Sequence, residues 1–202
     1  MSASNLEAPF PVLAVAAWSG TGKTTLLEQL LPMLRGYGLN VGVIKHAHHA
    51  FDVDKPGKDS YRLRSAGAAP MLVASRERFA LMQDTPGQQE PDLERLVELM
   101  VPHRPDLVIA EGFKAWPLPK LVLYRDGVGD PAIFQDAWVC AVACKRDERD
   151  ALERHSPKRS ATRLDLDDVA AVARWIAQWV AEQPAVEPTV EHSNSEGDRT
   201  CS

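Results

Sequence analysis

The chain has 202 residues, of which 45% are hydrophobic and 25% charged, and its formal net charge at pH 7 is −5. This length predicts one large domain with an adequate core, and an acidic balance without a continuous basic stripe argues against wholesale binding of nucleic acid. The first residues lack the pattern of a signal peptide, and the apolar runs are too short to span a membrane. The three cysteines have no CxxC spacing, which predicts free thiols in a reducing cytoplasm.

A glycine-rich loop, AWSGTGKTT at residues 17–25, separates an apolar strand candidate at 12–16 from a leucine-rich helix. Strand, glycine loop and helix in this order are typical of a phosphate-binding P-loop, although Ala17 stands where the motif usually begins with glycine. Glycines let the backbone turn tightly and direct N–H groups at phosphate oxygens. Lys23 supplies charge for the β- and γ-phosphates, and the Thr24 hydroxyl is a ligand for Mg²⁺. The predicted nucleotide contacts are Ser19, Gly20, Thr21, Gly22, Lys23, Thr24 and Thr25.

The helix after this loop has leucines at 27, 30, 31 and 34, which form one apolar stripe. Pro32 lies inside it and lacks the N–H that would bond the Glu28 carbonyl, so we expect a kink or an early loosening there. Gly36 and Gly38 are expected to end the helix.

A charged segment, KHAHHAFDVDKPGKDS at residues 45–60, follows a second strand predicted at 41–45. As a switch-like segment, it would bring Asp52 or Asp54 to the metal ion and Lys55 or Lys58 to anionic groups of the ligand. As a transition-metal site, it would use side chains that commonly bind such ions, namely His46, His48, His49 and Asp52. A solvated charged loop is the third interpretation.

Short helices and strands alternate through the rest of the chain. We predict a helix at 59–66, strands at 71–74 and 79–82 joined by a turn at 75–78, a helix from Pro91, strands at 107–110, 120–124 and 138–144, and a last helix capped by Asp167. This alternation predicts an α/β fold with a mostly parallel sheet flanked by helices. The predicted domain covers residues 9–183, with a flexible segment at 1–8 and a disordered tail at 184–202.

Glu111 directly follows the apolar strand at 107–110. Ligands of an open parallel sheet bind beyond the carboxyl ends of its strands. In a protein with a P-loop, a carboxylate at that position is a candidate for holding Mg²⁺ and orienting an attacking water. The alternative interpretation is an ordinary carboxylate of a surface turn.

The segment Cys144-Lys145-Arg146-Asp147 follows the last predicted strand of the sheet. Guanine-specific P-loop proteins commonly have Asn/Thr-Lys-x-Asp there, with the aspartate accepting hydrogen bonds from the base and the lysine stem packing over it. Lys145 and Asp147 fit this pattern, but Cys144 replaces the polar first residue. A charged strand end is an equally good interpretation.

Three segments together resemble the molybdopterin-guanine dinucleotide biosynthesis adaptor proteins, a P-loop family: residues 16–27, 44–60 and 108–114. This resemblance implies GTP binding with slow hydrolysis, a homodimer whose sheets join across subunits, and a role beside the guanylyltransferase that attaches GMP to molybdopterin. It leaves open whether molybdopterin touches the chain. The strand pair around 75–78 is the candidate for the dimer sheet.

In this scheme Lys23 and Glu111 are the catalytic residues, and Thr24, Asp54 and Glu111 hold Mg²⁺. Lys55 and Lys58 join Lys145 and Asp147 as nucleotide or substrate contacts. Two other functions use the same residues: a small-molecule kinase, with Arg62 and Arg64 as its only lid candidates, and a metal-delivery GTPase that uses the histidines at 46–49.

Overall fold

The computed structural model describes residues 6–47, 51–155 and 160–184. The chain divides into two compact units, which are described separately below. The sheet unit comprises the described parts of residues 1–44 and 94–202, and the hairpin unit comprises those of residues 45–93. Most of the predicted flexible segment at 1–8 and of the predicted tail at 184–202 lies outside the described residues.

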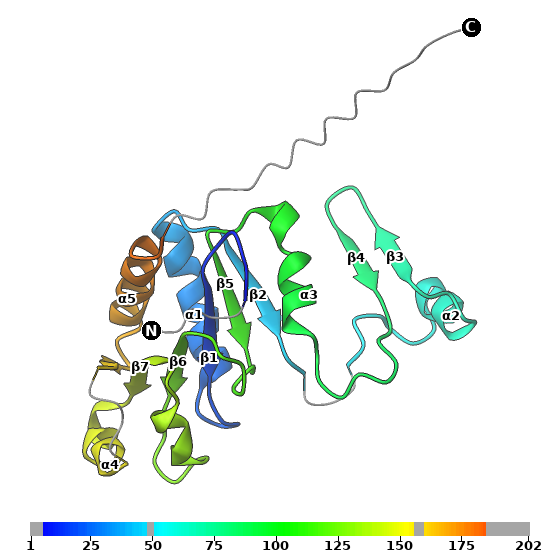
Figure 1. The fold of residues 1–202 in the computed structure, drawn as a ribbon. Coiled ribbons are helices and arrows are strands. Elements are labelled where there is room, and N and C mark those ends of the chain that lie inside the picture. The colour runs from blue at the N-terminus through cyan, green and yellow to red at the C-terminus, as the bar shows by residue number, and fades with distance from the viewer. Residues whose placement is uncertain (1–5, 48–50, 156–159, 185–202) are drawn as a thin grey trace, which may run out of the picture. The chain divides into compact units, whose positions relative to one another are not determined.

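A six-stranded sheet forms the centre of the sheet unit, with the strand order β2-β5-β1-β6-β7-β8 (Figure 1). β1 pairs in parallel with β5 and β6, and β7 pairs in parallel with β6 and β8. This arrangement confirms the α/β prediction. The strands are β1 (Val12–Ala16), β2 (Val41–Lys45), β5 (Leu107–Glu111), β6 (Lys120–Leu123), β7 (Val139–Cys144) and β8 (Thr162–Asp165).

Helices cover both faces of this sheet, which explains why its central strands are mostly apolar. On one face, α1 (Lys23–Gly36) and α5 (Val169–Ala181) lie side by side (Figure 1). They pack on side chains of β1, β5 and β6. On the other face, α4 (Arg149–Arg154) and the 3₁₀ segment η2 (Pro131–Gln135) pack against β6 and β7. Shorter elements complete the connections: α3 (Leu93–Glu98), η1 (Val101–His103) and η3 (Arg146–Glu148).

Local details differ from the sequence-based expectations at several points. α1 continues through Pro32 to Gly36, because its buried leucines hold it on the sheet. The N-cap of α5 is Asp168 instead of Asp167, and its carboxylate accepts a hydrogen bond from the Ala171 N–H at 2.9 Å. β8 and α4 were not predicted, because each is short and mixes charged with apolar residues.

The hairpin unit contains α2 (Asp59–Ser65) and the antiparallel strands β3 (Met71–Ala74) and β4 (Phe79–Met82). Ser75 closes the turn between the two strands, because its N–H donates to the Arg78 carbonyl at 2.8 Å. This pair matches the predicted hairpin. Among the described helices of the chain, none has both the length and the apolar character that crossing a bilayer requires.

Candidate nucleotide-binding site

The glycine loop leaves the carboxyl end of β1 and leads directly into α1. Gly20 has φ 83° and Gly22 has φ 88°, both in the left-handed region that favours glycine. The Thr21 hydroxyl and N–H both donate to the Trp18 carbonyl, at 2.8 and 3.3 Å, and close the turn. The helix then begins at Lys23, so the N–H groups of its first turn have no partner within the helix. This geometry is suited to binding an anion.

Lys23 lies beside the carboxylate that ends the neighbouring strand. Its Nζ is 3.0 Å from Oε1 of Glu111. Glu111 is the last residue of β5, pairs in register with Val15 of β1, and is only 7% exposed. The parallel pairing of β1 with β5 therefore brings together the two residues that the sequence analysis named as catalytic.

Thr24 and Thr25 are exposed in the first turn of α1, and Ser19 and Gly20 are exposed in the loop. Their polar groups are accessible to a ligand at the carboxyl edge of the sheet. A triphosphate with Mg²⁺ requires hydrogen-bond donors for the phosphates and oxygen ligands for the metal. The loop N–H groups are such donors, and the buried carboxylate and the threonine hydroxyl are such ligands. The residues of the sheet unit thus fit such a ligand.

Two further cations contact the loop, and the sequence analysis missed both. The ammonium of Lys114 lies over the ring of Trp18, 3.6 Å from its centroid. Burial lowers the pKa of Lys114, and repulsion from Lys23 lowers it further. Arg125 Nη1 donates to the Gly20 carbonyl at 3.0 Å. Both residues follow the strands that flank β1, so inspection of every strand end could have found them.

The predicted guanine contacts lie at the carboxyl ends of β7 and β8. Lys145 and Asp147 are exposed, and Lys145 Nζ is 4.0 Å from Oδ1 of Asp167. Between them in sequence, Arg146 Nε donates to Asp165 Oδ2 at the end of β8. This hydrogen bond lowers the pKa of Asp165. An open groove of about 430 Å³ adjoins the pair and is also lined by Gln29 of α1.

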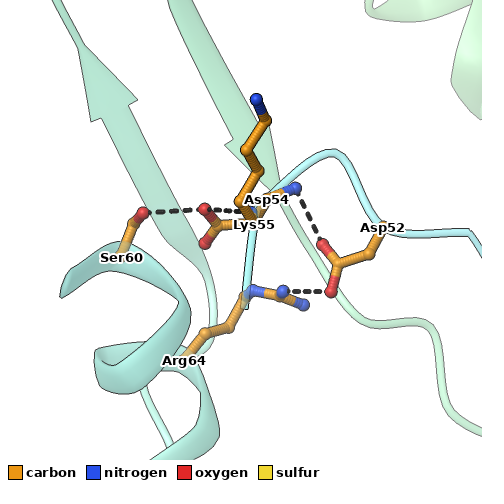
Figure 2. Close-up of polar contacts among 5 residues, drawn as sticks. All are labelled: Asp52, Asp54, Lys55, Ser60 and Arg64. Carbon is orange, nitrogen blue, oxygen red and sulfur yellow. Dashed lines mark hydrogen bonds and ion pairs between the residues drawn. The ribbon is translucent and has the colours of Figure 1, made fainter. Parts of the chain in front are cut away.

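A polar network organises the start of the hairpin unit (Figure 2). Arg64 Nη2 donates to Asp52 Oδ2 at 2.6 Å, and this bond lowers the pKa of Asp52. Asp54 Oδ1 accepts hydrogen bonds from the Ser60 hydroxyl at 2.9 Å and from the Lys55 N–H at 3.0 Å. The Lys55 side chain points away from the two carboxylates (Figure 2). Asp52 and Asp54 thus order the loop before α2.

The other predicted residues of the hairpin unit occupy varied surroundings. Lys55 and Lys58 are exposed, and Arg62 lies 3.7 Å from Asp59. His46 Nε2 lies 3.4 Å from Glu90 Oε2, whereas His48 and His49 lie outside the described residues. Within residues 6–47, 51–155 and 160–184, no group of three His, Cys, Asp or Glu side chains is arranged to hold a metal ion.

The sequence matches a known family over most of the sheet unit and all of the hairpin unit. The family model described as molybdopterin guanine dinucleotide synthesis protein B matches residues 12–145. The molybdopterin-guanine dinucleotide biosynthesis adapter protein of Escherichia coli (strain K12) is 54% identical over 135 residues, covering 66% of this chain and 77% of that protein. The adapter protein of that name from Haemophilus influenzae is 44% identical over 133 residues, covering 66% and 74%.

Solved structures of similar proteins have the same architecture. A crystal structure of molybdopterin-guanine biosynthesis protein B aligns with a TM-score of 0.63 at 28% identity, covering 85% of this chain and 99% of that one. Bacillus subtilis MobB aligns with a TM-score of 0.63 at 28% identity, covering 84% and 98%. The family match includes the glycine loop, Glu111 and Lys114, and it ends before Asp147.

Proposed function

The chain belongs to the molybdopterin guanine dinucleotide synthesis protein B family, and from this membership we propose that it is a GTP-binding adapter with slow GTPase activity. In this role it assists the guanylyltransferase that attaches GMP to molybdopterin. Its participation in molybdopterin guanine dinucleotide biosynthesis follows from the family, and nucleotide binding is inferred from the residues at the carboxyl edge of the sheet.

One observation carries the nucleotide proposal: the two left-handed glycines place the start of α1, Lys23 and the buried Glu111 around one point. A helix N-terminus with free N–H groups and an adjacent lysine attracts phosphate, and a carboxylate next to it attracts a cation. We assign the β- and γ-phosphates to Lys23, and Mg²⁺ to Thr24 and Glu111. Bound Mg²⁺ would neutralise charge that develops on the phosphates.

Three residues of the hairpin unit remain predicted ligand contacts. Asp54 is the third predicted Mg²⁺ residue, and Lys55 and Lys58 are the predicted contacts for anionic groups. The hydrogen bonds of Asp54 to Ser60 and to the Lys55 N–H support a defined loop conformation around these residues. A kinase would use Arg62 and Arg64 as a lid, and the ion pair of Arg64 with Asp52 gives no support to that alternative.

Guanine is the base that we assign to Lys145 and Asp147, which follow β7. Guanine presents two hydrogen-bond donors on one edge, which a carboxylate accepts, whereas adenine presents an acceptor at N1. Asp147 and Lys145 are the predicted contacts, and the Arg146–Asp165 pair fixes the loop that carries them.

The partners that we propose are a second copy of this chain and the guanylyltransferase. The proposed location is the cytoplasm. The β3–β4 pair supports self-association, because isolated two-stranded sheets are marginally stable and this one exposes Leu72, Phe79 and Leu81 at 47–62%.

Replacement of Lys23 by alanine tests the nucleotide site. We expect Lys23→Ala to lower GTP affinity by at least about tenfold, because one charge-assisted contact to phosphate contributes about 1.5–3 kcal/mol. Isothermal titration of the parent and the variant with GTP, in the presence of Mg²⁺, measures this loss. Equal melting temperatures would show that the fold is intact. Equal affinities would contradict the proposed site.

A further inference from the structure

Lys114 is held next to the glycine loop by its local backbone. Gly112 has φ 93° and turns the chain directly after Glu111. The Lys114 N–H donates to the Gly112 carbonyl at 3.0 Å, and Phe113 is buried with 2% exposure. The tight turn and the buried phenylalanine fix the direction in which Lys114 leaves the sheet. Its ammonium consequently lies over Trp18, a residue of the loop itself.

Positive charge is concentrated beside the glycine loop. Lys114 is close enough to Lys23 for their repulsion to lower the pKa of Lys114. Arg125 adds a third cation through its hydrogen bond to the Gly20 carbonyl, while Glu111 is the carboxylate paired with Lys23. Like charges held this close favour the binding of a multiply charged anion, which relieves their repulsion.

Trp18 is a fixed platform for the Lys114 ammonium. A Cβ added at Gly129 would overlap the indole, at 1.8 Å from Cδ1. Glycine is therefore required there for the chain at Gly129 to lie against Trp18. The indole Nε1 is buried and has no hydrogen-bond partner among the residues that the structure describes. An ammonium over a ring is bound more weakly than one that donates to a phosphate oxygen. Lys114 can therefore exchange Trp18 for a phosphate.

The strand order indicates which phosphate Lys114 can reach. The proposed base contacts follow β7, the loop follows β1, and Lys114 follows β5, on the side of β1 opposite to β7. A nucleotide with its base near β7 and its phosphates on the loop points its terminal phosphate toward β5. Lys114 therefore lies on the side of the γ-phosphate, as do Lys23 and Glu111.

We propose that Lys114 binds the γ-phosphate of the bound nucleoside triphosphate, leaving the ring of Trp18 when it does so, and that the chain thereby distinguishes a triphosphate from a diphosphate. This inference rests on the proposed function. Lys114 responds to the terminal phosphate, and the ring of Trp18 reports that response.

Affinities for GTP and GDP, each with Mg²⁺, test this role in the full chain. We expect Lys114→Met, which keeps the aliphatic stem, to lower GTP affinity about tenfold or more and to change GDP affinity by less than about twofold. Lys114→Arg should restore most of the preference for GTP. Arg35→Met is the control, because Arg35 is a cation in the last turn of α1, at the end remote from the loop. The control should leave the GTP:GDP ratio unchanged.

Tryptophan emission gives a second measurement that does not depend on hydrolysis. We expect GTP to change the emission of the parent more than GDP does, and Trp18→Phe to abolish the difference. If Lys114→Met or Lys114→Gln loses GTP and GDP affinity equally, or loses neither, while Lys23→Ala still impairs binding, the role of Lys114 is overturned and the nucleotide site stands. If the parent binds neither nucleotide, both proposals fail.

Discussion

Lys23 has two competing partners in the proposed site: the Glu111 carboxylate, 3.0 Å from its ammonium, and the phosphates of a nucleotide. Glu111 is buried in the sheet and cannot be solvated easily once Lys23 turns to the ligand. A cation that replaces Lys23 at the carboxylate would offset that cost. The Lys23–Glu111 pair thus gives a physical reason for binding of GTP and Mg²⁺ to be coupled.

Replacement of Glu111 by glutamine separates the competition for Lys23 from the binding of Mg²⁺. We expect Glu111→Gln to bind GTP about fivefold more tightly than the parent without Mg²⁺, because Lys23 no longer has a charged competitor. With Mg²⁺, the variant should gain less affinity than the parent and should hydrolyse GTP more slowly. Titrations with and without Mg²⁺ measure the coupling. Glu153→Gln, which removes a carboxylate paired with Arg163 at 2.9 Å, is the control.

Unaltered Mg²⁺ dependence in Glu111→Gln would exclude Glu111 from the metal site. Unaltered affinity without Mg²⁺ would show that the ion pair with Lys23 does not compete with phosphate. The two results are independent, because the first concerns the carboxylate and the second concerns the lysine.

At the scale of the elements, β6 begins at a lysine that is completely buried. Lys120 has 0% exposure, and its Nζ lies 2.8 Å from Asp136 Oδ2 and donates to the Trp116 carbonyl at 2.6 Å. Asp136 also accepts a hydrogen bond from the Trp138 N–H at 2.8 Å, just before β7. The pair therefore fixes the starts of two adjacent central strands, at the edge of the sheet opposite to the glycine loop.

Breaking this pair should destabilise the fold and leave the nucleotide site intact. We expect Asp136→Asn to lower the free energy of unfolding by about 3 kcal/mol, because the buried Lys120 ammonium loses its counter-charge. Lys120→Met should cost less, because the remaining Asp136 carboxylate is 26% exposed and can be solvated. Urea unfolding of both variants measures the difference. A larger loss in Lys120→Met would contradict this account.

At the scale of the whole molecule, the hairpin unit exposes apolar side chains that its own strands leave uncovered. Leu72 and Leu81 face each other across the strand pair and are 55% and 47% exposed. Burial of a leucine contributes about 1.5–3 kcal/mol, which favours association through this sheet. The predicted homodimer gives that apolar surface a partner.

Leu81→Glu tests the dimer. We expect the parent to have the mass of a dimer and the variant to be largely monomeric, because a buried unpaired carboxylate opposes association. Size-exclusion chromatography with light scattering at several concentrations measures the mass. Leu99→Glu, a change at a leucine that is 51% exposed outside the hairpin unit, should remain dimeric. Identical masses for the parent and Leu81→Glu would remove this sheet from the interface.

Many of the elements could be predicted from the sequence, because their signals are local. The strand at Val12–Ala16 is a short apolar run, and β3 and β4 are separated by polar turn residues. Capping was harder: Asp167 and Asp168 are both good caps, and the choice depends on Asp165 accepting a hydrogen bond from the Asp167 N–H at 3.0 Å. β8 was not predicted, because its local sequence pattern is weak and the strand forms through its pairing with β7.

The sequence by itself determined the glycine loop, since left-handed turns at Gly20 and Gly22 and the helix after them depend on neighbouring residues alone. Only the tertiary structure decided what surrounds that loop. Glu111 ends β5, Lys114 follows β5 and Arg125 follows β6. All three reach the loop because β5 and β6 pair on either side of β1. Which strands become neighbours depends on how helices and strands bury one another, and a local pattern does not record this.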